Sequence, residues 1–191
     1  MKAAVGAVIL QLRDKIGFPY TMVPIDAYMY GGAGIGGWGV LCGAPNGAAA
    51  AMNYVLPSRA VVDELCYELL GWYAETSLPS NLHDSYAKYP GQKQSVAGSP
   101  LCHASVSIWC RESGFGESSA ERKDRCAKLT GDCAAKAVEL LNAYFDGKFA
   151  KTYKVSATTA SCQGCHVGKD SMLDNSLTHM DCTPCHGDPH K

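Results

Sequence analysis

The chain has 191 residues, of which 47% are hydrophobic and 18% are charged, and its formal net charge is −1. This composition favours a folded protein over a disordered one, and the near-neutral charge argues against nucleic-acid binding. No apolar run approaches the roughly 20 residues that a membrane-spanning helix needs. Composition and charge therefore exclude disordered, nucleic-acid-binding and membrane-spanning proteins.

The N-terminus resembles a short signal peptide, because one lysine precedes an apolar run in MKAAVGAVILQLRDKIG. No cleavage site of the small-x-small type follows that run. Arg13, Asp14 and Lys15 follow instead, as at the polar end of an amphipathic helix. We therefore expect a first helix here and no export signal within this sequence.

Helical patterns continue through the first half of the chain. Ser58 is placed to cap a helix, and apolar residues recur at helical spacing after it. Residues 76–100 hold three prolines and no sustained period, which predicts a loop. A short helix is expected directly after this loop, across HASVSIWCRES.

A longer helical pattern begins near Ser118, which has capping-box spacing with Glu121. Gly131 is expected to end this helix, and Asp132 to cap a second one that stops near Gly147. The fold class predicted from these patterns is mainly α.

Two parts of the chain differ in character. Residues 1–155 are expected to form a helical, cysteine-rich body. Residues 156–191 are expected to form a separate, mostly irregular tail, because they contain few large apolar side chains and no sustained period.

The tail contains two units of the form Cys-x-x-Cys-His, separated by 15 residues. They are Cys162, Cys165 and His166, and Cys182, Cys185 and His186. Two thiols at this spacing reach the two vinyl groups of one porphyrin, and the histidine that follows is placed to ligate the iron. The pattern predicts two covalently attached haem c groups, with His166 and His186 as the proximal ligands.

Zinc and disulfides are the alternatives for these four thiols. Zinc sites also use pairs of Cys-x-x-Cys at a similar separation, but zinc does not need a histidine after each pair. The tail has too little apolar side-chain area to fold alone, and two porphyrins would provide a core. Haem is therefore the preferred interpretation.

Other histidines are candidates for the distal axial position. His179 lies three residues before Cys182, too close to reach the far side of the haem attached there, so it is better placed for the first haem or for one in another subunit. His103 would bring a ligand from the body. His190 lies four residues after His186 and is a further candidate.

Two methionines of the tail, Met172 and Met180, are also candidate axial ligands. His83 lies in the predicted loop and is expected to be a surface residue. Because several histidines are available, we expect bis-His ligation and a low reduction potential.

Six cysteines lie outside the two units. Cys66 falls on the buried side of the helix that follows Ser58 and is predicted to be a core thiol. Iron–sulfur clusters take four thiolates, and we predict that one is held here. The predicted ligands are Cys102, Cys110, Cys126 and Cys133, with Cys42 as a substitute. Two disulfides and a free thiol are the alternative.

The predicted cluster depends on a bend in the chain. Cys126 and Cys133 would lie about 10 Å apart in an unbroken helix, and Gly131 is expected to let the chain bend between them. The glycine-rich stretch GGWGVLCGA is expected to place backbone N–H groups near the sulfurs. Its G-x-G-x-x-G pattern is not a dinucleotide site, because no clear strand precedes it and no acidic residue follows about 20 positions later.

The sequence resembles the split-Soret cytochromes c of sulfate-reducing bacteria over most of its length. The resemblance rests on GWGVLCGAPNGAAAA, PLCHASVSIWC, RCAKLTGDC and the two C-terminal units. The body also resembles a wider group of redox proteins with a Gly-Cys-Ala-x-x-Gly motif. That motif is altered here to Cys42-Gly43-Ala44 followed by Gly47.

The resemblance implies a homodimer with two closely stacked, bis-His haems c per subunit and an iron–sulfur centre, [2Fe-2S] or [4Fe-4S], in the helical body. It also implies that the partner subunit lends one axial ligand. The expected function is electron transfer with a redox protein partner, in the periplasm of an anaerobic bacterium. A small reductase with an open coordination site on a haem iron or on the cluster is the alternative.

Overall fold

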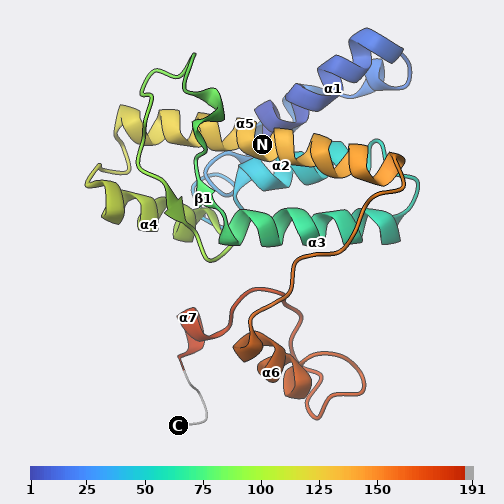
Figure 1. Cartoon of the computed structure of the whole chain (residues 1–191), viewed down its shortest axis with the longest axis vertical. Coiled ribbons are helices and arrows are strands. Elements are labelled where there is room, and N and C mark those ends of the chain that lie inside the picture. The colour runs from blue at the N-terminus through green and yellow to red at the C-terminus, as the bar shows by residue number, and fades with distance from the viewer. Residues whose placement is uncertain (188–191) are drawn as a thin grey trace. The chain divides into compact units, whose positions relative to one another are not determined.

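The computed structural model describes residues 1–187. Most of the described chain is helical, with one pair of two-residue strands, which confirms the mainly α prediction (Figure 1). The chain forms two compact units, of which the first is Met1–Thr152 and the second begins at Tyr153. Within the described residues, no helix combines the length and the apolar character needed to cross a membrane.

The body begins with the helix expected at the N-terminus, α1 (Lys2–Ile16). Two 3-10 helices, η1 (Tyr20–Met22) and η2 (Ile25–Gly31), follow and pack against it. Val5 and Ile9 of α1 are fully buried in this contact. The apolar run at the N-terminus thus forms a small core of its own.

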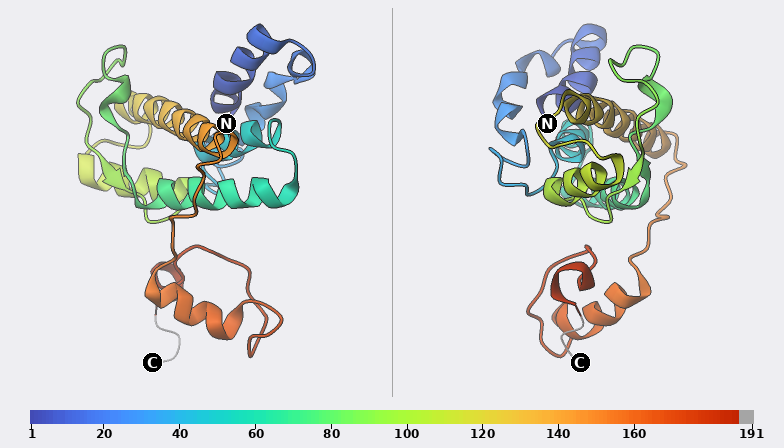
Figure 2. Two further views of the ribbon diagram at one scale, coloured as in Figure 1. Left: turned by 45° about the vertical axis from the view of Figure 1, so that its right-hand side comes forward. Right: turned by 90° about the vertical axis from the view of Figure 1, so that its left-hand side faces the viewer.

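The centre of the body is α2 (Gly43–Asn53), which contacts α1, α3 (Arg59–Glu75) and α5 (Ala120–Phe145) (Figures 1 and 2). Its sequence is mostly alanine and glycine, and small side chains let neighbouring helices approach closely. The predicted cap of α3 is confirmed, because Ser58 Oγ accepts from the Val61 N–H at 3.5 Å.

The main core lies between α2, α3 and α5. Its largest buried side chains include Met52, Leu65, Leu69, Tyr73, Leu129 and Leu141. Cys66 is half-buried and packs against this core. Burial raises the pKa of its thiol to about 11, so at neutral pH Cys66 is a protonated packing residue.

The predicted loop after α3 is mostly irregular. It contains β1 (Ser77–Leu78) and β2 (Ser95–Val96), which pair antiparallel, and the 3-10 helix η3 (Asn81–His83). The helix expected after the loop is α4 (Cys102–Ser113).

The helix break predicted at Gly131 is wrong, because α5 runs through it without interruption. The predicted start is also displaced by one residue. Ser119 rather than Ser118 is the N-cap, and its Oγ accepts from the Arg122 N–H at 3.1 Å. The glycine has a packing role instead of ending the helix.

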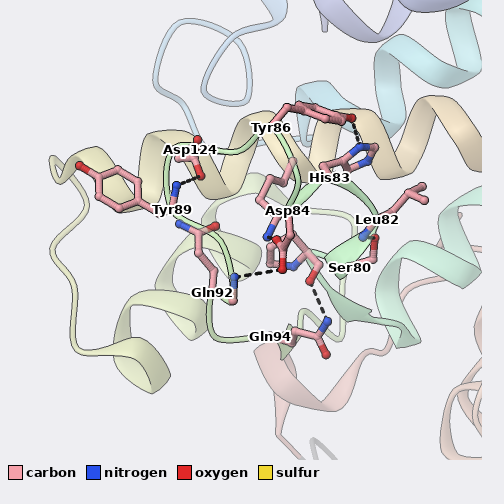
Figure 3. Close-up of polar contacts among 12 residues, drawn as sticks. Ser80, Leu82, His83, Asp84, Tyr86, Tyr89, Gln92, Gln94 and Asp124 are labelled. Carbon is pink, nitrogen blue, oxygen red and sulfur yellow. Dashed lines mark hydrogen bonds and ion pairs between the residues drawn. The ribbon is translucent and has the colours of Figure 1, made fainter.

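The absence of a side chain at Gly131 leaves room for the His83 ring against α5. A Cβ on Gly131 would lie 2.6 Å from His83 Nε2, so the ring packs directly against α5. His83 is only 8% exposed, which corrects its prediction as a surface residue. Its ring contacts Tyr86 (Figure 3) and lies 3.2 Å from the Asp132 carboxylate. Asp132 also accepts from the Ser80 N–H at 2.9 Å, so it anchors the loop and caps no helix.

The tail contains two short helices, α6 (Ala157–His166) and α7 (Thr183–His186). Asp181 holds the chain between them to the start of α6, because it accepts hydrogen bonds from the hydroxyls of Ser156 and Thr159. Among the described tail residues, only Thr159 is buried. The tail therefore has almost no core of its own.

Candidate cofactor and metal sites

Residues of both Cys-x-x-Cys-His units line a single cavity of about 520 Å³ in the tail, and Cys165 is the one thiol of the two units that does not line it. The first unit ends α6, and the second occupies α7 and the residue before it. The pKa of the Cys182 thiol is raised by burial and then by charge on Cys162, so one thiol of each unit lies near the other. The tail thus brings together two motifs that lie 15 residues apart in the sequence.

Helical geometry explains the spacing within each unit. Cys162 and Cys165 lie one turn apart on α6, so their side chains emerge on the same side. Cys182 and Cys185 have the same relation at the start of α7. Two thiols on one face, followed by a histidine, form the donor set that covalent haem attachment uses.

A side chain from the intervening loop orients the first histidine. His166 Nδ1 lies 2.8 Å from Asn175 Oδ1, and the Asn175 N–H donates to the His166 carbonyl at 2.9 Å. An Nδ1–H that donates to an oxygen fixes the tautomer in which Nε2 is the metal donor. Sequence reasoning missed Asn175, and nothing in the local pattern marks it.

The candidate distal ligands are spread over the molecule. His179 is exposed and does not line the tail cavity, whereas Met180 does. His103 belongs to the body and lines a different cavity. His190 lies outside the described residues. Within the described tail, the histidines of the two units are the only ones that line the cavity.

The large apolar side chains of the tail face solvent. Leu177 is 93% exposed and Met172 is 83% exposed. A segment of this kind cannot bury enough apolar area to fold by itself. The thiols, the imidazoles and the uncovered apolar side chains together fit a porphyrin cofactor.

A second candidate site lies in the body, where two segments bring Cys42 and Cys102 together. A β-bridge joins Leu41 to Leu101, and the Cys42 N–H donates to the Pro100 carbonyl at 2.9 Å. The two thiols hydrogen-bond to each other. This bond lowers the pKa of Cys42 to about 6 and raises that of Cys102, so the pair favours one thiolate near neutral pH.

The unbroken α5 places Cys126 and Cys133 on the same side, two turns and about 10 Å apart. Cys133 is fully buried, and its pKa is raised by burial and then by negative charge on Cys42. The pKa of Cys102 is raised mainly by Cys42 and by burial, and also by Cys126. Both α5 cysteines therefore lie near the Cys42–Cys102 pair, although no bend at Gly131 brings them there.

Cys110 stands apart from the other four. It follows Cys102 by about two turns of α4, and its pKa is raised mainly by burial, with a smaller contribution from the charge of Cys126. In the described range 1–187, no three His, Cys, Asp or Glu side chains converge closely enough to hold a metal ion as they stand. The thiols as they are placed therefore do not form a site for a single metal ion.

A cavity of about 410 Å³ opens beside these thiols. Its lining includes Cys42, Cys102 and Cys126 and most of the glycine-rich loop 31–39. Gly34 has a φ of 65°, and a Cβ there would lie 2.9 Å from the Cys102 Cβ. Only glycine permits this approach, so the loop is built to pack its backbone against the cysteine site.

Sequence reasoning also missed a buried polar group beside the thiols. Arg125 is 1% exposed, and its Nη2 donates to Ser105 Oγ at 2.8 Å. Tyr73 Oη lies 2.8 Å from the same oxygen and also contacts the Cys42 thiol. The available signal was the position of Arg125 on the buried face of α5, directly before Cys126.

Comparison with known proteins places these sites in a family context. Residues 5–140 match the family described as "Putative redox-active protein (C_GCAxxG_C_C)". Split-Soret cytochrome c of Desulfovibrio desulfuricans is 38% identical over 179 residues, which are 92% of this chain and 64% of that protein. The chain thus spans less than two thirds of the length of this curated relative.

A solved structure of split-Soret cytochrome c from Desulfovibrio desulfuricans, described as having a novel iron centre, superposes with a TM-score of 0.89. The sequence identity is 36%, and the match covers 98% of this chain and 79% of that one. The likeness therefore includes the body and the tail.

Proposed function

Since this chain belongs to the split-Soret cytochrome c family, we propose that it transfers electrons by means of two haem c groups in its tail and an iron–sulfur centre in its body. The observation that carries the proposal is the single cavity lined by both Cys-x-x-Cys-His units. Haem and iron–sulfur groups supply one-electron chemistry when they are bound. The residues of the chain attach, ligate and shield them.

Each unit would attach one haem. The thiols of Cys162 and Cys165 would add across the two vinyl groups of the first porphyrin, and those of Cys182 and Cys185 across the two of the second. His166 and His186 would then be the proximal ligands. The effect of Cys162 on the pKa of Cys182, together with the cavity that both thiols line, supports two haems attached side by side.

The distal ligands are proposed to complete bis-His coordination. The described tail offers no third histidine to the cavity, which favours a ligand from outside the same tail. His179 is exposed and is suited to reach a haem of a second copy. His103 and His190 remain the other candidates. This arrangement would make the homodimer the functional unit.

The iron–sulfur centre, [2Fe-2S] or [4Fe-4S], is proposed at Cys42, Cys102, Cys126 and Cys133. Cys42, the substitute in the sequence prediction, replaces Cys110, because it hydrogen-bonds to Cys102 and its charge reaches Cys133. The similar solved structure is described as having a novel iron centre, which supports an iron site besides the haems.

A periplasmic location and a redox protein partner are part of the same proposal, since covalent haem attachment accompanies export. The second candidate function is a small reductase, which the 410 Å³ cavity beside the thiols favours. Carbon monoxide or cyanide binding distinguishes the two functions. Six-coordinate haems in an electron carrier resist both ligands, whereas an open coordination site binds them.

Spectroscopy and iron analysis on one sample test the main proposal. We expect two haems c per chain from the alkaline pyridine haemochrome, a divided Soret band after reduction with dithionite, and more than two irons per chain. Two haems and only two irons per chain would contradict the proposed iron–sulfur centre. The absence of a Soret band would overturn the cytochrome assignment and favour zinc as the group that the tail binds.

A further inference from the structure

Arg125 is a buried cation that faces no carboxylate. It is 1% exposed, its Nε is buried without a hydrogen-bond partner, and within residues 1–187 it forms no ion pair. The hydroxyl of Ser105 is its only close oxygen partner in that range, at 2.8 Å. Lys128, the other buried cation of α5, contrasts with it, because Asp84 pairs with it directly.

Such a position is costly unless negative charge lies nearby. An uncompensated buried charge costs several kcal/mol, and Ser105 offers only a neutral acceptor. The groups that face the guanidinium are sulfurs. Its Nη1 lies 3.9 Å from Cys126 Sγ, and its field also reaches Cys42, Cys102, Cys133 and the more distant Cys110.

We propose that Arg125 is the fixed counter-charge of the iron–sulfur centre, and that it raises the reduction potential of that centre. The inference rests on the centre proposed above. Each electron that such a centre would accept from a haem or from a redox partner would add one negative charge beside the guanidinium. A fixed cation in a low-dielectric interior favours that reduced state. Ser105 and Tyr73 hold the guanidinium in place and link it to Cys42.

The first test is the potential of the centre in the full-length haem protein. Arg125→Met removes the charge and keeps a side chain of similar length. We expect it to lower the equilibrium constant for reduction of the centre about tenfold, which lowers the reduction potential by about 59 mV for one electron. Arg125→Lys should keep most of the wild-type potential. Lys128→Met removes an equally buried but paired cation from the same helix, and it should leave the potential unchanged. Redox titration followed by electron paramagnetic resonance measures all three.

The second test compares urea unfolding of the iron-loaded protein with that of protein from which a chelator has removed the non-haem iron. A counter-charge stabilises the loaded form more than the iron-free form, in which only the Cys42 thiolate lies near it. Arg125→Met should therefore lower the unfolding midpoint more with iron than without it. Lys128→Met should lower both midpoints. Arg125→Gln replaces the methionine variant if the latter does not accumulate.

The outcomes separate this inference from the proposed function. Absence of non-haem iron in the wild-type protein would overturn the centre, and the counter-charge with it. If non-haem iron is present but Arg125→Met does not change its potential and destabilises the iron-loaded and iron-free proteins equally, the counter-charge role of Arg125 is overturned and the centre is not. Arg125 would then be a structural residue.

Discussion

Single residues outside the cysteine motifs contact the proposed cofactor ligands, and Asn175 is the clearest case in the tail. Its side-chain oxygen lies 2.8 Å from His166 Nδ1. An acceptor at Nδ1 makes the imidazole a stronger donor to iron, which stabilises the oxidised state. The same loop residue holds the end of α6 through its backbone N–H.

Removing this acceptor is expected to shift one haem and not the other. Asn175→Leu should raise the potential of one haem by about 59 mV, a tenfold change in its reduction equilibrium. Asn175→Asp keeps an acceptor and adds charge, so it should lower that potential. Spectroelectrochemical titration resolves the two haems. Ser176→Ala is the control, because only its backbone N–H bonds to His166. Shifts of the same sign in both Asn175 variants would contradict the orienting role.

At the scale of elements, α4 carries two cysteines with different surroundings. Cys102 starts the helix beside Cys42, whereas Cys110 lies about two turns later and does not line the cavity beside the other thiols. Cys102→Ser should therefore lose most of the non-haem iron, and Cys110→Ser should keep it. Chemical iron analysis normalised to haem content measures this. Equal loss in the two variants would restore Cys110 to the ligand set.

The loop after α3 is held to α5 by polar contacts. Lys128 lies against Asp84, and the Asp124 carboxylate accepts from the backbone N–H groups of Lys88 and Tyr89 at 3.2 Å (Figure 3). The hydrogen bond from Lys128, followed by that from the Gly91 N–H, lowers the pKa of Asp84 below its ordinary 3.8. A loop without a core of its own thus depends on charged groups of the neighbouring helix.

This dependence predicts a pH effect. Because the folded pKa of Asp84 is depressed, its contribution to stability is present above pH 3.8 and is lost as the pH falls through the folded pKa. Wild type should therefore exceed Asp84→Asn in unfolding free energy at pH 7, and the gap should close towards pH 2. Urea unfolding at several pH values measures it. Asp146→Asn removes an exposed ion pair and should show little difference at any pH.

At the scale of the whole molecule, stability is divided unequally between the two units. Both hydrophobic clusters lie within Met1–Thr152, and only Thr159 is buried among the described residues after Tyr153. The tail should therefore depend on its cofactors for order, whereas the body should not.

Removing haem attachment is expected to leave the body folded and the tail unfolded. A variant with alanine at Cys162, Cys165, Cys182 and Cys185 should keep a cooperative unfolding transition, while a protease removes its tail. Limited proteolysis with mass spectrometry locates the cuts, and the wild-type haem protein is the control. A tail that resists digestion without haem would show that it folds by its own contacts.

The sequence by itself determined the mainly α fold class, the family resemblance and the two Cys-x-x-Cys-His units as the chemistry-bearing motifs. These features are local: helical periodicity, the cap at Ser58 and the spacing of thiols are all read within a few residues. The continuity of α5 was not readable in this way. Gly131 favours a helix end by propensity, and only the packing of His83 against it reveals its role.

Only the tertiary structure decided which distant residues meet. Cys42 and Cys102 come together because the chain pairs at Leu41 and Leu101, and no sequence pattern encodes that pairing. The burial of Arg125 beside the thiols depends on the contacts of α5 with the rest of the body. Long-range packing determines which thiols of the body lie near one another and which charges surround them, because both depend on distances between segments that are far apart in the chain.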